Sequence, residues 1–194
     1  MEKSQYELCA EVLRRLDKAG VLRDIIIVGS WCTLFYRKFF GRTSYMVSLV
    51  TRDMDLLIPR PSAMRAKTDV AELLKDLGFV VGFTGSKGFI RLQHPQLIVE
   101  FLVPERGRGS DKPYALPHPA NFALHKLLVL ARRPTPEKQM KDKEAALRVL
   151  SALIDKGQGN LITDVFHTMP RKWQAMVKRQ LTDAVEEPIL DLLR

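Results

Sequence analysis

Hydrophobic residues recur at helical spacing over residues 5–18, and this amphipathic pattern predicts a surface helix. Residues 25–28 are a wholly apolar, β-branched run, which is typical of a buried strand. Gly29 and Ser30 interrupt the run, and Ser30 is a suitable N-cap for a helix over residues 31–39. The pattern therefore predicts a helix, a strand, a tight turn and a second helix at the start of the chain.

The pattern changes near residue 104. The elements expected before it are extended segments at 45–50 and 54–58, a helix at 62–77 and strands at 79–83, 89–92 and 97–103, with a turn at 85–88. After a loop at 104–119, helices are expected at 120–131, 137–156, 161–168 and 171–193. The sequence predicts an α+β fold with a helical C-terminal half, divided into domains at residues 1–103 and 104–194.

Composition excludes several classes of protein. Of the 194 residues, 46% are hydrophobic, which is enough for a sizeable core and unlike a disordered chain. The longest stretch without Asp, Glu, Lys or Arg has 13 residues, whereas a membrane span needs roughly 20 apolar ones. The polar N-terminus lacks the apolar run of a signal peptide, and Cys9 and Cys32 form no metal-type pair. We expect a soluble, cytoplasmic protein with reduced thiols and no membrane partner.

The net charge is +9, from 31 Lys and Arg against 22 Asp and Glu. Residues 104–148 contain ten basic and five acidic residues and so contribute +5 of this charge. A basic surface attracts polyanions such as nucleic acid or nucleoside triphosphates. The alternative is an ordinary solvated surface, and charge alone does not decide between the two interpretations.

Three acidic residues lie in runs that otherwise have the pattern of strands. Asp53 and Asp55 are two residues apart, so in a strand both side chains point to the same face. A divalent cation relieves the repulsion between two aligned carboxylates, and Mg²⁺ prefers such oxygen ligands. Glu100 has three apolar residues on each side and needs a cation or water, because burying an unpaired carboxylate is costly. The alternative is that the aspartates lie on an exposed strand face and pair with Arg52 or Arg60.

The turn at Gly29 and Ser30 is a candidate phosphate-binding site. A strand that passes through Gly-Ser into a helix N-terminus leaves backbone N–H groups free for an anion. Gly29 permits close approach of the backbone, and Ser30 adds a hydroxyl donor. The alternative is an ordinary strand–turn–helix with a serine cap. Together, the turn and the three carboxylates supply what nucleotidyl transfer requires: metal ions, a triphosphate site and a base.

These residues resemble the motifs of the nucleotidyltransferase superfamily, which has the DNA polymerase β-like fold. The family pattern is an apolar strand, Gly-[Gly/Ser], a helix, two acidic residues alternating with hydrophobic ones, and a later strand-borne carboxylate. The corresponding parts here are residues 25–30, Asp53 and Asp55 within residues 51–56, and Glu100 within residues 99–101. Thr51, two residues before the first aspartate, is common in bacterial branches of the family. The resemblance covers residues 20–103, and a longer gap between the first two motifs indicates an inserted segment near residues 38–50.

The resemblance implies a mixed β-sheet with flanking helices, two Mg²⁺ ions with Mn²⁺ as an alternative, and a nucleoside triphosphate such as ATP. By analogy, Asp53, Asp55 and Glu100 form a catalytic triad. Both aspartates bind metal, and Glu100 binds the second metal and helps to activate the acceptor hydroxyl. Gly29 and Ser30 hold the phosphates. One fold hosts many substrates, so the analogy sets only the class of reaction.

Lys126 is a further candidate for nucleotide binding. It lies in an apolar helical stretch, close to the edge of the hydrophobic stripe. One interpretation is a surface lysine whose stem packs on the helix while its ammonium reaches water. The other is a lysine that faces the triphosphate from the helical half.

We therefore expect a Mg²⁺-dependent nucleotidyltransferase that moves a nucleoside monophosphate from a triphosphate to an unidentified acceptor. The acceptor classes are RNA or tRNA, a protein, and a small molecule. Two alternatives are kept: a catalytically weak module of the same fold that binds nucleic acid or a protein partner, and a toxin-type nucleotidyltransferase of a toxin–antitoxin pair. The sequence does not indicate the oligomeric state.

Overall fold

The structure is a computed structural model that describes residues 4–47, 51–84, 89–103 and 118–194. The predicted turn at 85–88, most of the loop at 104–119 and the end of the extended segment at 45–50 lie outside the described residues.

The chain divides into two compact units, and the division falls inside helix α2 (Trp31–Phe40). The α/β unit contains Met1–Cys32 and Thr51–Pro117. The helical unit contains Thr33–Val50 and His118–Arg194. The segment Thr33–Val50, between the Gly29-Ser30 turn and the aspartates, therefore belongs to the helical unit.

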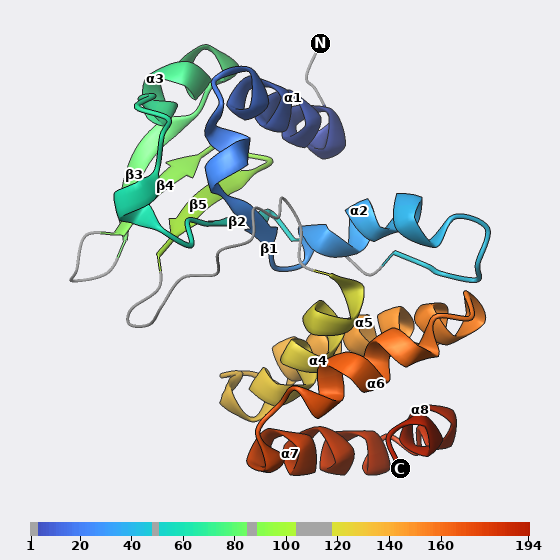
Figure 1. The fold of residues 1–194 in the computed structure, drawn as a ribbon. Helices are drawn as coiled ribbons and strands as arrows, with labels where there is room; N and C mark the ends of the chain where they lie inside the picture. Colours follow the sequence, from blue (N-terminus) through green and yellow to red (C-terminus); the bar gives the residue numbers. More distant parts are fainter. Residues whose placement is uncertain (1–3, 48–50, 85–88, 104–117) are drawn as a thin grey trace. The chain divides into compact units, whose positions relative to one another are not determined.

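A five-stranded mixed sheet forms the centre of the α/β unit (Figure 1). Its strands are β1 (Ile26–Val28), β2 (Asp53–Leu57), β3 (Val80–Thr84), β4 (Phe89–Gln93) and β5 (Ile98–Leu102). The order across the sheet is β1-β2-β5-β4-β3, with β2 and β5 parallel and the other neighbouring pairs antiparallel. The predicted fold class, an α+β mixed sheet with flanking helices and a helical C-terminal half, is confirmed.

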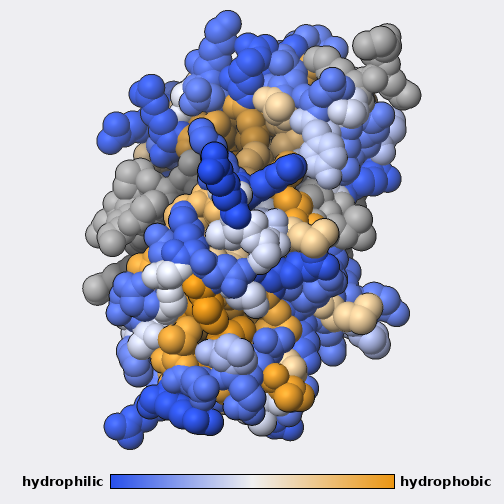
Figure 2. Space-filling view, turned by 90° about the vertical axis from the view of Figure 1, so that its right-hand side faces the viewer, coloured by the Kyte–Doolittle hydropathy of each residue, from blue (hydrophilic) through white to orange (hydrophobic). Residues whose placement is uncertain are grey.

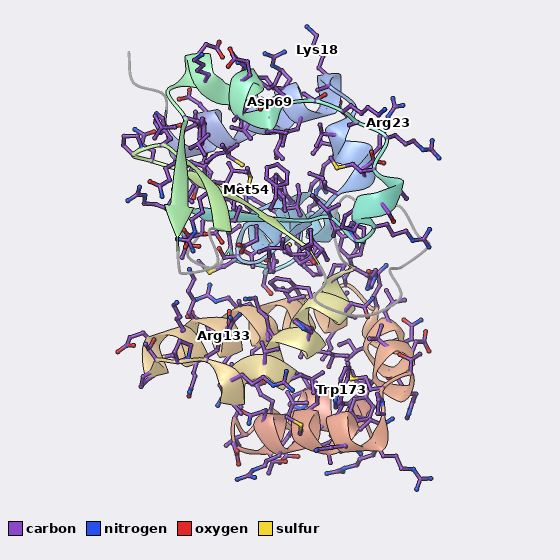
Figure 3. All side chains as sticks on the ribbon, turned by 90° about the vertical axis from the view of Figure 1, so that its left-hand side faces the viewer. Lys18, Arg23, Met54, Asp69, Arg133 and Trp173 are labelled. Atoms are coloured by element: carbon purple, nitrogen blue, oxygen red, sulfur yellow. The ribbon has the colours of Figure 1, made fainter. Side chains whose placement is uncertain are left out.

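Helices α1 (Gln5–Lys18) and α3 (Val70–Leu74) cover one face of this sheet (Figure 1). The apolar stripe of α1 is buried, as its spacing predicts. Within that stripe the sulfur of Cys9 lies 3.7 Å from the sulfur of Met54 on β2, and Met54 lies in the interior of the unit (Figure 3). Burial raises the pKa of the Cys9 thiol to about 12, so Cys9 is a protonated packing residue at neutral pH.

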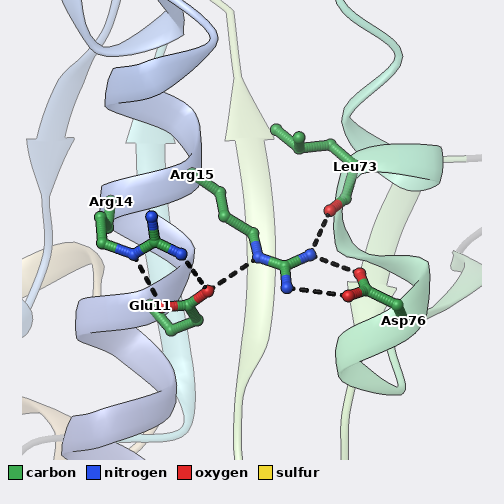
Figure 4. Close-up of polar contacts among 5 residues, drawn as sticks. All are labelled: Glu11, Arg14, Arg15, Leu73 and Asp76. Atoms are coloured by element: carbon green, nitrogen blue, oxygen red, sulfur yellow. Dashed lines mark hydrogen bonds and ion pairs between the residues drawn. The ribbon is translucent and has the colours of Figure 1, made fainter.

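Arg15 joins α1 to the segment around α3 (Figure 4). Its guanidinium donates to the backbone carbonyl of Leu73 at 2.8 Å and to Asp76 in the 3₁₀ turn η3 (Lys75–Leu77), also at 2.8 Å. The Nε–H of Arg15 donates to Glu11 at 2.9 Å within α1. The hydrogen bonds from Arg15 hold the pKa of the Asp76 carboxyl below its usual value. These bonds connect α1 to α3 and to the turn η3 that follows it.

The start predicted for the helix over residues 62–77 is wrong. Pro61–Ala63 form a separate 3₁₀ turn, η2, and α3 begins only after Asp69, whose carboxylate caps two backbone N–H groups of the first turn. The carboxylate of Asp24 accepts from the backbone N–H groups of residues 65 and 66. Because these groups bond to a distant side chain, residues between η2 and α3 remain a loop.

The helical unit contains five further α-helices in its described part (Figure 1). They are α4 (Pro119–Val129), α5 (Pro136–Asp155), α6 (Gly159–His167), α7 (Arg171–Thr182) and α8 (Glu187–Leu192). Helices α4 and α5 pack against each other, and their buried residues include Leu124, Leu127, Val149 and Leu153. His118 caps α4 and Thr135 caps α5 by accepting backbone N–H groups of the first turn.

The single helix expected over residues 171–193 is instead two helices, α7 and α8. Val185 lies between them with a φ of 58°, and Pro188 occupies the first turn of α8. Proline lacks the N–H that a helix interior requires but is tolerated in a first turn, where that donor has no intrahelical partner. The proline therefore marks the start of a new helix.

Residues 33–47 pack within the helical unit. The ring of Tyr36 lies edge-on to the ring of Phe122 on α4, with centroids 5.3 Å apart. The hydroxyl of Tyr45 donates to the backbone carbonyl of Thr33 at 2.8 Å. Residues 45–47 are not in a strand, so the predicted extended segment has no sheet partner in its described part.

In the part of the chain that the structure describes, no helix combines the length and the hydropathy that a membrane span needs. The side of the molecule drawn in Figure 2 is largely hydrophilic, and hydrophobic residues show in small groups between the charged ones.

Candidate active site

The register of the sheet places the three predicted carboxylates on one face. Val28 lies opposite Asp55 in the β1–β2 pair, and Asp55 lies beside Glu100 in the parallel β2–β5 pair. Asp53 is two residues before Asp55 on β2 and so projects to the same side of the sheet. The three positions are therefore neighbours on adjacent strands.

Burial distinguishes this face from the opposite one. Met54 and Leu56, which alternate with the aspartates on β2, are fully buried on the side that α1 and α3 cover. Asp53 is exposed, Asp55 is half-buried, and the side chain of Glu100 retains 17% exposure. The carboxylates thus lie opposite the hydrophobic layer, where a hydrated ligand has access.

Gly29 leaves room for the Asp55 carboxylate. Its φ of 74° lies in the left-handed region that favours glycine. A Cβ atom at this position would come within 2.3 Å of Asp55 Oδ2. The missing side chain thus serves two purposes, because it allows the turn after β1 and lets the carboxylate lie against the backbone of that turn.

Ser30 connects this turn to the start of β2. Its hydroxyl oxygen lies 2.9 Å from Thr51 Oγ1, and the backbone N–H of Thr51 donates to the same oxygen at 3.4 Å. The backbone carbonyl of Thr51 in turn accepts from the side chain of Gln5 at 3.3 Å. These bonds hold the predicted phosphate-binding turn and the predicted metal-binding strand at a fixed separation within the α/β unit.

Glu100 pairs with Arg91 on the neighbouring strand β4. The two residues are register partners, and Arg91 Nε lies 2.6 Å from Glu100 Oε1. The expectation that the carboxylate in this apolar strand needs a cation is met by a side chain that the sequence did not reveal. Of the arginines considered as partners of the aspartates, Arg52 donates to the backbone carbonyl of His94 at 3.2 Å.

The donor set fits a divalent cation at the two aspartates better than at all three acids. Mg²⁺ and Mn²⁺ prefer carboxylate oxygens, and the absence of a Cβ at Gly29 lets the Asp55 carboxylate lie close to the turn. Among the described residues, however, no group of three or more His, Cys, Asp or Glu side chains is arranged to hold a metal. The ion pair with Arg91 already balances the charge of Glu100, so a cation at Glu100 would compete with that arginine.

Lys126 lies in α4 of the helical unit and is buried, with 7% exposure. Its ammonium forms an ion pair with Asp142 of α5, and Arg133 (labelled in Figure 3) binds the other oxygen of that carboxylate. The Lys126 ammonium also lies 5.1 Å from the centroid of the Phe122 ring. The surface-lysine interpretation is therefore wrong, and phosphate binding by Lys126 stays a prediction.

The sequence did not predict Arg91 as the partner of Glu100, nor Asp142 as the partner of Lys126. Arg91 meets Glu100 only because β4 and β5 pair, and its signal was a lone arginine in an apolar strand. Asp142 meets Lys126 across two helices, and its signal was an acidic residue within a basic run. Both contacts depend on tertiary pairing rather than on local spacing.

The mixed sheet, the Gly-Ser turn and the alternating aspartates are features of a nucleotidyltransferase. A model of the nucleotidyltransferase family matches residues 7–116, more than half of the 194 residues. The chain therefore belongs to the nucleotidyltransferase family, which confirms the resemblance predicted from its motifs, and it is a transferase that uses a nucleoside triphosphate.

Comparison with other proteins gave two further findings. None of the curated proteins matches the chain. Two solved structures of ANT(2'')-Ia are similar at 14% identity. The solution structure of this antibiotic-resistance factor has a TM-score of 0.46 and aligns over 87% of this chain and 99% of that one. The crystal structure with adenylyl-2''-tobramycin has a TM-score of 0.45 and aligns over 82% and 97%.

The contact at Gly29 gives a prediction with an internal control. Gly29→Ala and Gly20→Ala each place a side chain at a φ near 75°, but of the two new Cβ atoms only the one at Gly29 would have a neighbour within 4 Å. Both variants should lose about 1–2 kcal/mol of stability from backbone strain. Gly29→Ala should lose more and should also lower transfer activity, because its Cβ displaces the Asp55 carboxylate. Thermal unfolding and a transfer assay measure both effects, and equal behaviour of the two variants would contradict this role of Gly29.

Proposed function

We propose that the protein transfers a nucleoside monophosphate from a triphosphate such as ATP to an acceptor, with Mg²⁺ or Mn²⁺ as cofactor. The observation that carries the proposal is the row formed by Asp55 and Glu100, next to Asp53 and against the Gly29-Ser30 turn. Acidic side chains are seldom gathered on one sheet face without a cation to balance them. A turn that leads into the start of a helix provides the anion-binding groups beside them.

The residue roles follow from these positions. Asp53 and Asp55 would bind the divalent cation, and Glu100 would bind a second one and help to activate the acceptor hydroxyl. Such a cation neutralises charge on the triphosphate and polarises the bond to the leaving group. Gly29 and Ser30 would hold the phosphates through backbone N–H groups and the serine hydroxyl, which Thr51 orients. Most of the rate enhancement would come from positioning and charge neutralisation.

Lys126 keeps its proposed role in nucleotide binding with one condition. Its ammonium is engaged by Asp142, so a phosphate would have to share or replace that carboxylate. Arg133 is 40% exposed in its side chain and is the more accessible cation of this cluster.

The acceptor is proposed by class: RNA or tRNA, a protein, or a small molecule. A positive chain of net charge +9 favours a polyanionic acceptor, because electrostatic attraction raises the rate of encounter. A toxin-type nucleotidyltransferase that acts on tRNA remains an alternative, and its antitoxin would be encoded by the neighbouring gene.

A labelled-nucleotide assay tests the proposal. The protein is incubated with each of the four α-labelled triphosphates, Mg²⁺ or Mn²⁺, and separate pools of tRNA, protein and small-molecule acceptors. We expect one combination to transfer label in a metal-dependent manner, with the labelled pool identifying the acceptor class. Tight RNA binding without transfer from any triphosphate would instead favour the weakly catalytic binding module.

A further inference from the structure

Arg91 places a permanent positive charge beside the proposed metal site. The register of the sheet forms a continuous row across three strands, from Arg91 on β4 to Glu100 on β5 and Asp55 on β2. Only Glu100 separates the arginine from the aspartate in this row. The guanidinium therefore lies in the field of the same carboxylates that would attract a divalent cation.

The ion pair has the geometry of a strong contact. Arg91 Nε and Glu100 Oε1 are 2.6 Å apart, and the side chains are 36% and 17% exposed. A guanidinium is positively charged at neutral pH. It therefore balances the charge of Glu100, in a position where water screens the charge only in part.

We propose that Arg91 is the built-in counter-ion of this site, holding Glu100 in the metal-free protein and competing with a divalent cation for that carboxylate. The proposal rests on the proposed function and adds a positioning residue to it. Arg91 does not touch the reacting atoms in this scheme. It lowers the affinity for the cation, because the guanidinium and the cation compete for the charge of the same carboxylate.

The arrangement explains how the carboxylates coexist when no cation is bound. Without Arg91, the positions of Asp53, Asp55 and Glu100 would place three negative charges on neighbouring sites of one sheet face. With Arg91, the net negative charge of this group is reduced by one, because the guanidinium pairs with Glu100.

Titration with Mn²⁺ tests the proposal without relying on catalysis. The dissociation constant is measured by calorimetry for the full chain, for Arg91→Gln, for Glu100→Gln and for the double variant. Arg91→Gln should bind Mn²⁺ about fivefold to tenfold more tightly, the scale of removing one competing charge at contact distance. In the Glu100→Gln background the same change should alter the constant by less than about twofold, because the carboxylate under competition is gone.

Two further variants serve as controls. Lys18→Gln removes one positive charge from the exposed surface of α1 and should change Mn²⁺ affinity by less than about twofold. Arg91→Lys keeps the charge and should stay close to the unmodified protein. If Arg91→Gln does not fold, Arg91→Met replaces it, since its aliphatic stem can pack on the sheet.

The outcomes separate failure of this inference from failure of the proposed function. Equal or weaker Mn²⁺ binding by Arg91→Gln, or an equal gain in the Glu100→Gln background, would overturn the role of Arg91. In that case Mn²⁺ binding that disappears in Asp53→Asn still supports the metal site itself. Absence of Mn²⁺ binding in every variant would overturn both.

Discussion

Asp53→Asn and Asp55→Asn should each lower the rate of nucleotidyl transfer by at least about 100-fold, the scale of losing one preorganised electrostatic contact. Asparagine keeps the size and polarity of aspartate but lacks the charge that binds a divalent cation. The free energy of unfolding of the metal-free protein should stay unchanged or rise slightly, because each substitution relieves repulsion between neighbouring carboxylates. Transfer rates and urea unfolding are to be measured on the same preparations.

The matched control is Asp17→Asn, the same chemical change at an exposed position on α1. It should leave the transfer rate unchanged. The free energy of unfolding should change by no more than about 0.5 kcal/mol, the ordinary limit for a surface substitution. Full activity in Asp53→Asn would disprove its assignment as a metal ligand. A loss of stability without a loss of activity would indicate that the aspartates serve only the fold.

Much of the α/β unit could be predicted because its signals are local. The apolar run at residues 25–28 indicates a buried strand, and the alternation around Asp53 and Asp55 specifies a strand with one defined face. Period-two alternation also predicted that both aspartates share a face, and the sheet register then placed Glu100 beside them. Spacing within a segment determined the strands and the shared face of the aspartates, so for these features no partner strand had to be known.

The rest could not be predicted because it depends on contacts between distant segments. Arg91 and Glu100 are nine residues apart but meet only through antiparallel pairing of β4 and β5. The loop before α3 is held open by Asp24, which is about forty residues earlier in the chain. Lys126 has the pattern of a residue at the edge of an apolar stripe, yet helix α5 covers it and provides its counter-ion. In each case tertiary bonding overrides local preference.

Asp142→Ala should produce the largest loss of stability among the substitutions considered, about 3–5 kcal/mol. The carboxylate of Asp142 is 10% exposed and binds both Lys126 and Arg133. Its removal leaves the Lys126 ammonium buried without its counter-ion, because the lysine is 7% exposed. Arg133 is 40% exposed and can turn to water, so it contributes less to the loss. Urea unfolding of the purified variant measures the effect.

A double-mutant cycle shows whether the loss comes from the buried charge. Lys126→Met alone should destabilise less than Asp142→Ala, because Asp142 keeps Arg133 as a partner. The cycle compares Lys126→Met and Asp142→Leu, each alone, with the two combined. The double variant should recover most of the stability, since an apolar pair of similar volume often replaces a buried ion pair without loss. Glu144→Ala, which breaks an exposed pair with Arg148 on the same helix, should have an effect below about 1 kcal/mol. Strict additivity in the cycle would contradict the coupling.

Because the double variant is expected to fold, its nucleotide affinity can also be measured. An unchanged affinity would assign Lys126 to the stability of the helical unit rather than to phosphate binding.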